Sequence, residues 1–263
     1  YTLICSFNDG LDLMKGGVYL WPRKFTLNNY KLFISDADWR NAFFLSVLRT
    51  VVGTLFCTGF TSMFSYALSR NNLMFKKGYR FLVVFTMYFS GGLIPYYVLL
   101  RSLGLLNTFW VYVIPGMVNA FFVMTGINFF GSIPESMIEA AKIDGASEFK
   151  VLTKVVLPVS KPFLATLSLF AAVGQWNSWL DAAYYVRDSN LHTLSYKVMT
   201  TINQALASSV NTEAAGQMSQ ANTSTQFTVQ ATAMAVSMLP IMCVYPFLQK
   251  YFVQGMMIGA VKE

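Results

Sequence analysis

The stretch that decides the fold is Ser132–Pro162, SIPESMIEAAKIDGASEFKVLTKVVLPVSKP, a polar segment between two long apolar runs. Ser132 and Glu135 match the S-x-x-E capping box, which predicts that a helix begins here with Pro134 in its first turn. Gly145 predicts the end of that helix, because glycine accepts the left-handed backbone of a helix C-cap.

A second short helix is predicted after Gly145, with Ser147 as its N-cap and with Pro158 and Pro162 ending it. The apolar residues are Met137, Ile138 and Ala141 in the first helix, and Phe149, Leu152, Val155 and Val156 in the second. The pattern indicates a helix–glycine–helix elbow over 132–162, outside the bilayer. Two interpretations stay open. The elbow is an amphipathic hairpin on the membrane or on its own domain, or it docks another protein.

The composition is that of a membrane protein. Hydrophobic residues make up 55% of the chain and charged residues 12%, and the mean hydropathy is +0.47, whereas a soluble domain carries about 25% charged residues. Long apolar runs hold most of this excess, so we expect an all-α, polytopic transmembrane helical bundle. The net charge of +7 fits a membrane surface better than nucleic acid, because the basic residues form no aromatic-interleaved patch.

The sequence shows no catalytic or cofactor-binding motif. The three cysteines lack metal-ligand spacing and are expected to be small buried hydrophobes, and His192 is the single histidine. We find no nucleophile elbow, phosphate-binding loop or dinucleotide fingerprint. We therefore expect that the chain is not an enzyme, holds no metal or cofactor, and depends on a partner for energy.

Five complete membrane spans are expected, at 42–68, 81–103, 109–130, 163–183 and 228–251. The first residues, YTLICSF, read as the last turns of an apolar helix, so a further span is expected before Tyr1. Residues 8–40 and 184–227 are polar and are expected to be external loops, the former with short amphipathic pieces.

The loop 69–80, SRNNLMFKKGYR, gives the orientation because it holds four basic residues and no acidic one. Short basic loops stay in the cytoplasm, so the elbow should be cytoplasmic as well. Arg49, near the outer start of its span, is expected to snorkel towards the interface rather than pair with an acid on a neighbouring helix. Gly91, Gly92 and Pro95 interrupt the 81–103 span, and a packing kink is favoured there over a moving hinge.

Polar residues also gather at the end of the 163–183 span, which reads GQWNSWLD over 174–181. Amides and indoles are costly in lipid, so they should face the bundle or a cavity. They serve either as hydrogen-bonding contacts between helices or as a sugar-contacting surface, where C–H faces stack on indole and hydroxyls pair with amides. The predicted substrate path contains Asn119, Gln175, Trp176, Asn177, Trp179 and Asp181.

The elbow resembles the EAA signature of the permease subunits of ATP-binding-cassette (ABC) importers. The matching residues are Glu139, Ala140, Ala141, Asp144, Gly145, Ala146, Leu157 and Pro158, followed by Pro162. In that family the elbow is the coupling helix, which sits in a groove of a cytoplasmic ATPase subunit. Trp176-Asn177, and Trp21-Pro22 with the residues up to Tyr30, resemble carbohydrate permeases of the maltose and multiple-sugar type.

The resemblance implies a single transmembrane domain over 1–263 in a bacterial inner membrane, importing sugars from an extracytoplasmic binding protein. It implies a second homologous permease and two ATPase subunits that hold ATP and Mg²⁺. The 91–95 segment and the tail from Lys250 resemble the subgroup for complex, including uronate-containing, oligosaccharides. The resemblance implies that the 184–227 loop docks the binding protein or lines the external mouth, with a plain linker as the alternative. It implies that the tail reaches into the ATPase dimer, with a frayed terminus as the alternative. The alternative is a secondary transporter or channel, which should carry ionisable groups at mid-membrane.

Overall fold

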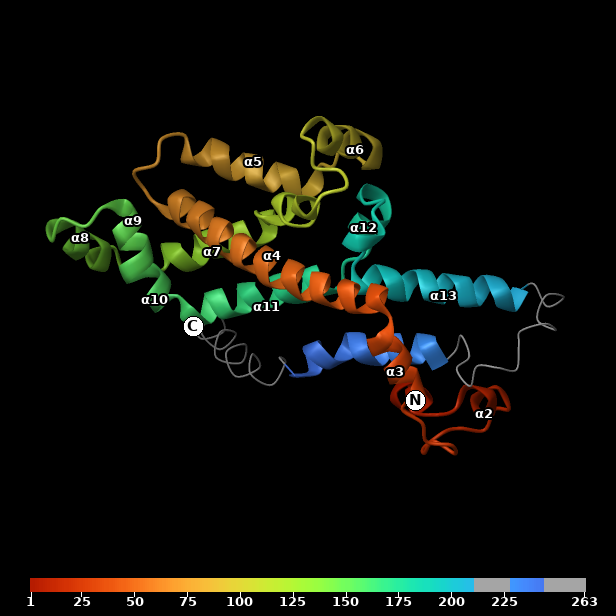
Figure 1. Cartoon of the computed structure of the whole chain (residues 1–263). Helices are drawn as coiled ribbons and strands as arrows, with labels where there is room; N and C mark the ends of the chain where they lie inside the picture. Colours follow the sequence, from red (N-terminus) through yellow and green to blue (C-terminus); the bar gives the residue numbers. More distant parts are fainter. Residues whose placement is uncertain (211–227, 244–263) are drawn as a thin grey trace. The chain divides into compact units, whose positions relative to one another are not determined.

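The structure is a computed structural model in which residues 1–210 and 228–243 are described (Figure 1). Its elements are helices, and an isolated antiparallel bridge joins Asn8 and Phe25 in the N-terminal part. The chain divides into two compact units. Of the described residues, we call 1–48 with 176–210 and 228–243 the first unit, and 49–175 the second unit.

The first unit has a small core built from helices that are far apart in the sequence. Phe33, Trp176, Leu194 and Ala233 are buried together there. The elements are α1 (Thr2–Ser6), α2 (Gly10–Met14), α3 (Asn28–Ser35), the start of α4 (Ala37–Ser69), α12 (Leu180–Tyr185), η4 (Ser189–Leu191), α13 (Leu194–Val210) and the helix Thr228–Cys243.

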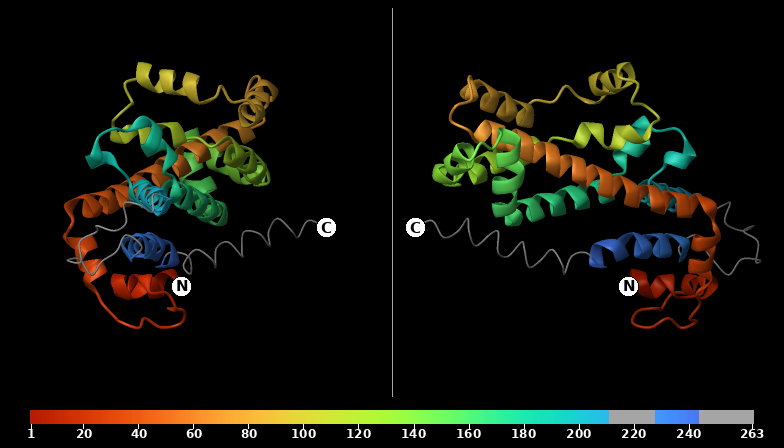
Figure 2. Two further views of the ribbon diagram at one scale, coloured as in Figure 1. Left: turned by 90° about the vertical axis from the view of Figure 1, so that its right-hand side faces the viewer. Right: turned by 60° about the vertical axis from the view of Figure 1, so that its left-hand side comes forward.

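The second unit has its core at one end of α4, where Tyr66, Phe130 and Phe163 pack against the elbow. Figures 1 and 2 show the elbow helices α8 and α9 beside this end of α4 in every view. The remaining elements are α5 (Lys76–Tyr88), α6 (Leu93–Ser102), η1 (Phe109–Tyr112), η2 (Ile114–Gly116), α7 (Ala120–Gly131), α8 (Glu135–Ile143), α9 (Glu148–Val151), η3 (Leu152–Val156), α10 (Leu157–Val159) and α11 (Lys161–Asn177).

One described helix, α4, is by itself long and apolar enough to cross a membrane, and the count rises to four if each of three bent helix pairs is one span. α4 confirms the span predicted at 42–68 and extends it to Ala37–Ser69. Small residues allow α4 to approach its neighbours closely. A Cβ on Gly126 of α7 would lie 2.5 Å from Ser65 Oγ of α4.

The span predicted at 81–103 is two helices rather than one kinked helix. α5 and α6 meet at a bend of 117°. Gly92, between them, has a φ of +85°, which glycine adopts without strain. The favoured interpretation of a packing kink is therefore wrong, because a break of this size changes the direction of the chain altogether.

The other two bent pairs are less uniform. The 109–130 segment is a 3₁₀ stretch, η1 and η2, followed by α7 after a bend of 43°. The chain turns by 87° between α10 and α11, next to Pro158 and Pro162. The span predicted at 163–183 is shorter than expected, since α11 ends at Asn177 and the separate helix α12 begins at Leu180.

The two segments predicted to be external loops, 8–40 and 184–227, differ in how far the structure agrees with the prediction. The 8–40 segment contains α2 and α3 as the short helical pieces predicted, with Asp9 capping α2 through Leu11 N at 3.0 Å. The 184–227 segment is not simply a loop, because α13 occupies 194–210. Thr193 caps α13 by accepting from Tyr196 N at 3.3 Å, and Leu194 is buried.

Several predictions fall on residues outside the described part of the chain. These are the 211–227 part of the external loop, the 244–251 part of the last span, and the tail after Lys250. Cys5 and Cys57 are buried as predicted, whereas Cys243 is exposed. The expectation of a single transmembrane domain over 1–263 stays a prediction.

Candidate functional site

The elbow begins two residues later than the capping box requires. α8 has Pro134 at its N-cap and no side-chain cap, so Glu135 is the first helical residue and cannot reach back to Ser132. The Ser132 hydroxyl instead donates to Phe129 O at 2.7 Å, at the end of α7. The predicted capping box is therefore wrong, although a helix does start here.

The glycine turn of the elbow is confirmed in detail. Gly145 has a φ of +80°. Gly145 N donates to Lys142 O at 2.9 Å, and Ala146 N donates to Ala141 O at 2.9 Å. These two bonds form a Schellman motif, in which the residues before and after the turn also touch through apolar side chains. Ala141 and Ala146 both pack against the core of the second unit, so the small residues of the signature have a structural reason.

The second elbow helix starts at Ser147 as predicted, with the Ser147 hydroxyl accepting from Lys150 N at 3.4 Å. Leu152 and Val156 of the predicted apolar stripe are buried, whereas Phe149 is 63% exposed and Val151, outside the stripe, is buried. The π-helical turn η3 follows α9 directly and carries more residues per turn than an α-helix. This change of period moves the buried face away from the spacing expected for an α-helix.

Most of the elbow's apolar surface is used within the second unit. Ile138, Val151, Leu152 and Val156 are buried in its core. Packing on its own domain, one of the two open interpretations, thus accounts for these four residues. Ile143 is 85% exposed, and with Phe149 it leaves an apolar surface on both sides of Gly145. The sequence pattern put Phe149 on the apolar stripe of the second helix and gave no signal for Ile143.

The signature residues divide into an exposed set and a packed set. Glu139, Ala140, Asp144, Gly145 and Pro158 are exposed, and Ala141, Ala146 and Leu157 are half-buried against the core. Of the exposed set, Asp144 and Gly145 lie at the turn between Ile143 and Phe149, Glu139 and Ala140 lie in the last turns of α8, and Pro158 lies further along the chain in α10. A partner protein can therefore contact carboxylates and apolar side chains together at this turn.

Glu148 ties the elbow to α4. Its carboxylate lies 2.5 Å from Lys142 Nζ of α8 and accepts from the Tyr66 hydroxyl of α4 at 3.0 Å. The elbow lies outside the spans, and the hydrogen bond from Lys142 holds the pKa of Glu148 below its ordinary value, with the bond from Tyr66 adding to this effect. Three elements thus meet at one carboxylate.

We expect the Glu148 contacts to contribute modestly to stability, because both charged side chains are largely exposed. In a double-mutant cycle with Tyr66→Phe and Glu148→Ala, the coupling free energy of unfolding at pH 7 should be about 0.5–1 kcal/mol. A lowered carboxyl pKa stabilises the fold above the ordinary pKa of glutamate, and this stabilisation is lost as pH falls through the lowered value. A coupling energy of zero at pH 7 would contradict the link.

A buried polar cluster lies at the other end of the second unit. Arg49 of α4 is 2% exposed, and its Nε donates to Gln175 Oε1 of α11 at 2.9 Å. Its guanidinium lies 4.5 Å from the ring centre of Tyr112. The expected snorkelling of Arg49 is therefore wrong. The side chain turns into the unit because an amide and an aromatic face offer it polar contacts there.

Two glycines make room for the Gln175 side chain. A Cβ on Gly53 would lie 2.7 Å from the Gln175 amide carbon, and one on Gly116 would lie 3.2 Å from its Nε2. Gly53 thus allows the Gln175 side chain to pack closely against α4. Gln175, the path residue with the clearest polar environment, is held in a slot beside Arg49.

Trp176, the next residue, faces into the first unit. Its side chain is 6% exposed, its Nε1 donates to Ser237 O at 2.9 Å, and Phe43 packs edge-on at 6.1 Å between ring centres. Ser195 Oγ donates to the Trp176 carbonyl at 2.5 Å. These contacts are those of the interhelical packing that the sequence left open as an alternative. A sugar-contacting role for Trp176 stays a prediction.

The other predicted path residues lie at helix ends. Asn119, in the second unit, caps α7 by accepting from Phe122 N at 3.3 Å. In the first unit, Asn177 is exposed, Trp179 is half-buried at the N-cap of α12, and Asp181 Oδ1 accepts from Ala182 N at 3.0 Å. Of the predicted path residues, Gln175 is thus the one in contact with Arg49. Arg49 was not among the residues predicted to form the path.

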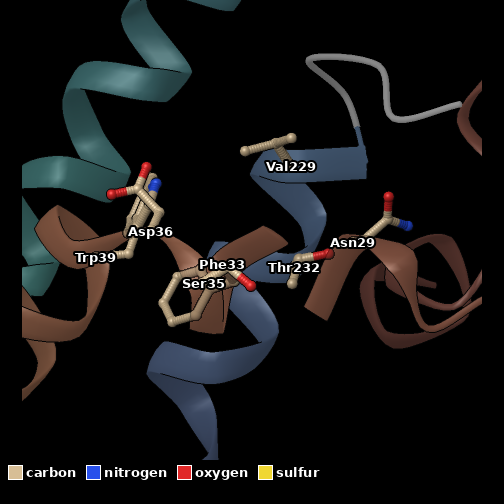
Figure 3. Close-up of a pocket in the computed structure, with 7 residues that line it drawn as sticks. All are labelled: Asn29, Phe33, Ser35, Asp36, Trp39, Val229 and Thr232. Carbon is tan, nitrogen blue, oxygen red and sulfur yellow. The ribbon is translucent and has the colours of Figure 1, made fainter. Parts of the chain in front are cut away.

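The first unit also holds a pocket of about 470 Å³, shown in Figure 3. α3, the start of α4 and the helix Thr228–Cys243 line it with Asn29, Phe33, Ser35, Asp36, Trp39, Val229 and Thr232. The Asn29 amide donates to Ser6 O and Asn8 O, so it serves the fold. The carboxylate of Asp36 makes the pocket unsuited to a negatively charged ligand.

Within residues 1–210 and 228–243, no group of three or more His, Cys, Asp or Glu side chains could hold a metal ion. The expectation that ATP and Mg²⁺ are bound by a partner, and no cofactor by this chain, stays a prediction.

Comparison with known proteins identifies the family. Residues 42–258 match the model of the binding-protein-dependent transport system inner membrane component. The protein LplC of Bacillus subtilis (strain 168) is 36% identical over 262 residues, which cover 100% of this chain and 88% of LplC. The polygalacturonan/rhamnogalacturonan transport system permease protein YtcP of the same strain is 35% identical, covering 100% of this chain and 91% of YtcP.

A solved structure has the same fold. It is that of a bacterial ABC transporter involved in the import of the acidic polysaccharide alginate, and its matched chain is 30% identical with a TM-score of 0.85. The match covers 96% of this chain and 89% of that one. The fold is therefore the all-α helical bundle of an ABC importer permease, and the chain belongs to the family of binding-protein-dependent transport system inner membrane components.

Proposed function

We propose that this chain is the permease subunit of an ATP-driven importer for oligosaccharides that carry acidic sugar units. Family membership supports transport that depends on a binding protein. YtcP is named for polygalacturonan and rhamnogalacturonan transport, and the matched structure belongs to an importer of the acidic polysaccharide alginate. The sugars of these systems carry carboxylates, which a positive group along the path of the permease would bind.

The observation that carries the proposal is the buried cluster of Arg49, Gln175 and Tyr112. A guanidinium binds a carboxylate through two parallel N–H donors, an amide pairs with sugar hydroxyls, and an aromatic ring stacks on the C–H face of a sugar. A buried charge in a membrane-spanning helix is costly, so it indicates a functional position. The cluster is buried here, and it meets the sugar when the helices part.

The transport cycle we propose is alternating access driven by partners. Two ATPase subunits bind ATP and Mg²⁺, and their closure moves the elbow through the exposed turn at Ile143, Asp144 and Phe149. A second permease completes the path, and an extracytoplasmic binding protein delivers the sugar. ATP shifts the conformation only if it binds the closed ATPase arrangement more tightly than the open one. Asn119, Asn177, Trp179 and Asp181 would be neutral or orienting contacts of the path.

The test compares an acidic with a neutral substrate. The complete importer in proteoliposomes, with ATP inside and binding protein outside, is supplied with a galacturonate oligomer or a galactose oligomer of the same length. Arg49→Gln should lower uptake of the acidic oligomer about tenfold or more, since a charge-assisted hydrogen bond contributes about 1.5–3 kcal/mol. Arg49→Gln should leave the uptake rate of the neutral oligomer at the level of the parent importer.

Two further variants sharpen the result. Arg49→Lys keeps the charge but lacks the planar fork, so its acidic uptake should be intermediate. Arg101→Gln removes an exposed cation at the end of α6 and should leave both rates unchanged. If Arg49→Gln lowered the uptake of both oligomers equally, Arg49 would not distinguish acidic from neutral sugars. Uptake without ATP would exclude the importer class itself.

A further inference from the structure

A second pocket lies in the second unit, where α4 and α7 end and α5 and α8 begin. It has a volume of about 450 Å³ and is mostly polar. Its lining residues are Ser69, Arg70, Asn71, Lys76, Arg80, Ile127, Asn128, Gly131, Ser132, Ile133 and Glu135. The pocket is separate from the exposed turn at Gly145 and from the Arg49 cluster, so neither proposed role accounts for it.

Three cations converge on this pocket, Arg70 from the loop after α4 and Lys76 and Arg80 from the first turns of α5. Arg70 donates from Nη2 to Phe130 O at 3.2 Å, Lys76 from Nζ to Ser69 O at 3.2 Å, and Arg80 from Nη2 to Leu68 O at 3.0 Å. These bonds fix the side chains against the C-terminal carbonyls of α4 and α7, where positive charge is favourable. A guanidinium has five N–H donors, so both arginines keep donors for a further ligand.

The charge of the pocket is not balanced by its own residues. Glu135 is the acidic residue among those that line it, against Arg70, Lys76 and Arg80. The Glu135 carboxylate lies beside the Asn71 amide, which donates to it at 3.4 Å. The pocket therefore presents a net positive charge with several N–H donors held in fixed positions, which is the chemistry that binds phosphate groups.

Exposed apolar side chains border the same cations. Met74 and Phe75, in the loop before α5, are strongly exposed, and Phe81 one turn into α5 is exposed too. Phe75 has a φ of +56°, so the chain turns sharply there. Positive side chains next to exposed aromatic ones are typical of a membrane interface, where rings lie at the headgroup level. The basic loop itself indicates the cytoplasmic leaflet, which carries the anionic lipids.

We infer that the pocket formed by Arg70, Lys76 and Arg80 binds a phosphate group, supplied by the headgroup of an anionic phospholipid in the cytoplasmic leaflet. The arginines and Lys76 hold the phosphate oxygens, and Met74, Phe75 and Phe81 contact the acyl chains. The bound lipid would steady the loop at the point where α4, α7 and α8 meet. This inference does not depend on which sugar is transported.

The experiment measures phosphatidylglycerol binding to the complete importer in neutral-lipid nanodiscs or detergent, by native mass spectrometry. Lys76→Gln keeps an N–H donor for Ser69 O and removes the charge. It should weaken binding about fivefold, the factor that one basic residue contributes at an anionic surface. Lys77→Gln changes the neighbouring exposed lysine, which does not line the pocket, and should leave the affinity within twofold.

A gain-of-binding variant covers the case in which Lys76→Gln folds poorly. Glu135→Gln removes the opposing charge without removing a contact to the cations, so phosphatidylglycerol should bind several-fold more tightly. Inorganic phosphate is titrated as the soluble probe. Displacement of phosphatidylglycerol by phosphate would show that the lipid headgroup occupies the phosphate site, whereas phosphate binding without phosphatidylglycerol binding would show that the site takes a free ion and would overturn the lipid part of the inference. Equal affinities for Lys76→Gln, Lys77→Gln and the parent, with no gain for Glu135→Gln, would overturn the inference.

Discussion

Replacing Gly145 with valine should abolish ATP-driven uptake while the importer still assembles in the membrane. Gly145 has a φ of +80°, and a Cβ built there meets nothing within 4 Å. The cost is therefore backbone strain and not a clash. A β-branched residue in the left-handed region costs about 1–3 kcal/mol, and the elbow can relieve the strain only by changing its turn.

A changed turn would displace the surface proposed to dock on the ATPase. Ile143 and Phe149 lie on either side of Gly145, on α8 and α9, so a different turn moves one relative to the other. The carboxylate of Asp144 moves with them. The buried face of the elbow, with Ile138 and Val156, stays in the core of the second unit. The subunit should thus remain folded while its link to the ATPase is lost.

The measurement is sugar-stimulated ATP hydrolysis and uptake in the same proteoliposomes. Gly145→Val should hydrolyse ATP without responding to sugar and should take up little of it. Gly145→Asn should keep most of the activity, because asparagine tolerates the left-handed region. Gly78→Val is the matched control, since its Cβ is also unobstructed and its φ is not positive. Normal stimulation in Gly145→Val would show that the turn does not couple the subunits.

The glycine turn could be predicted from the sequence because its cause is local. A left-handed residue after a helix, and a serine three residues before an amide it can cap, are decided by the residues themselves. The buried stripe of the second elbow helix could not be predicted in the same way. It depends on the π-helical turn over Leu152–Val156, and the residue types there do not indicate that the number of residues per helical turn changes.

The membrane spans show a similar limit. Hydropathy counts apolar residues but carries no information on the direction of the chain, so a bend of 117° between α5 and α6 looks like one interrupted span. The sequence did not predict helix α13, because hydropathy fails in the opposite direction there. Its composition is polar enough for a loop, and its helical pattern is decided by the packing of Leu194 and Val198 in the first unit.

The buried polar cluster required the structure. Arg49 and Gln175 are 126 positions apart in the chain, and their contact at 2.9 Å follows from the packing of α4 beside α11. From the sequence, the position of Arg49 near the start of a span indicated snorkelling, because the available neighbours were unknown. The amides and indoles of the 174–181 segment could be recognised from the sequence. That Gln175 lies beside Arg49 in the second unit while Trp176 packs in the first unit could not.

That division leads to the second large effect expected. Trp176→Ala should destabilise the importer by about 3–5 kcal/mol, the usual cost of truncating a buried aromatic side chain. The substitution removes the contact with Phe43 and leaves Ser237 O without its donor. Asn177→Ala, one residue further on, removes an exposed amide and should change the free energy of unfolding by less than about 0.5 kcal/mol.

The two neighbours should therefore fail in different assays. Trp176→Ala should give little assembled importer and a lower melting temperature, with the assembled fraction still transporting. Asn177→Ala should assemble fully, and its uptake per complex should fall if this amide contacts the sugar. Trp176→Phe, which keeps most of the ring but loses the donor to Ser237 O, should cost only about 1 kcal/mol. If Trp176→Ala assembled fully but transported poorly, the indole would lie in the sugar path. Its contacts with Phe43 and Ser237 would then contribute little to stability.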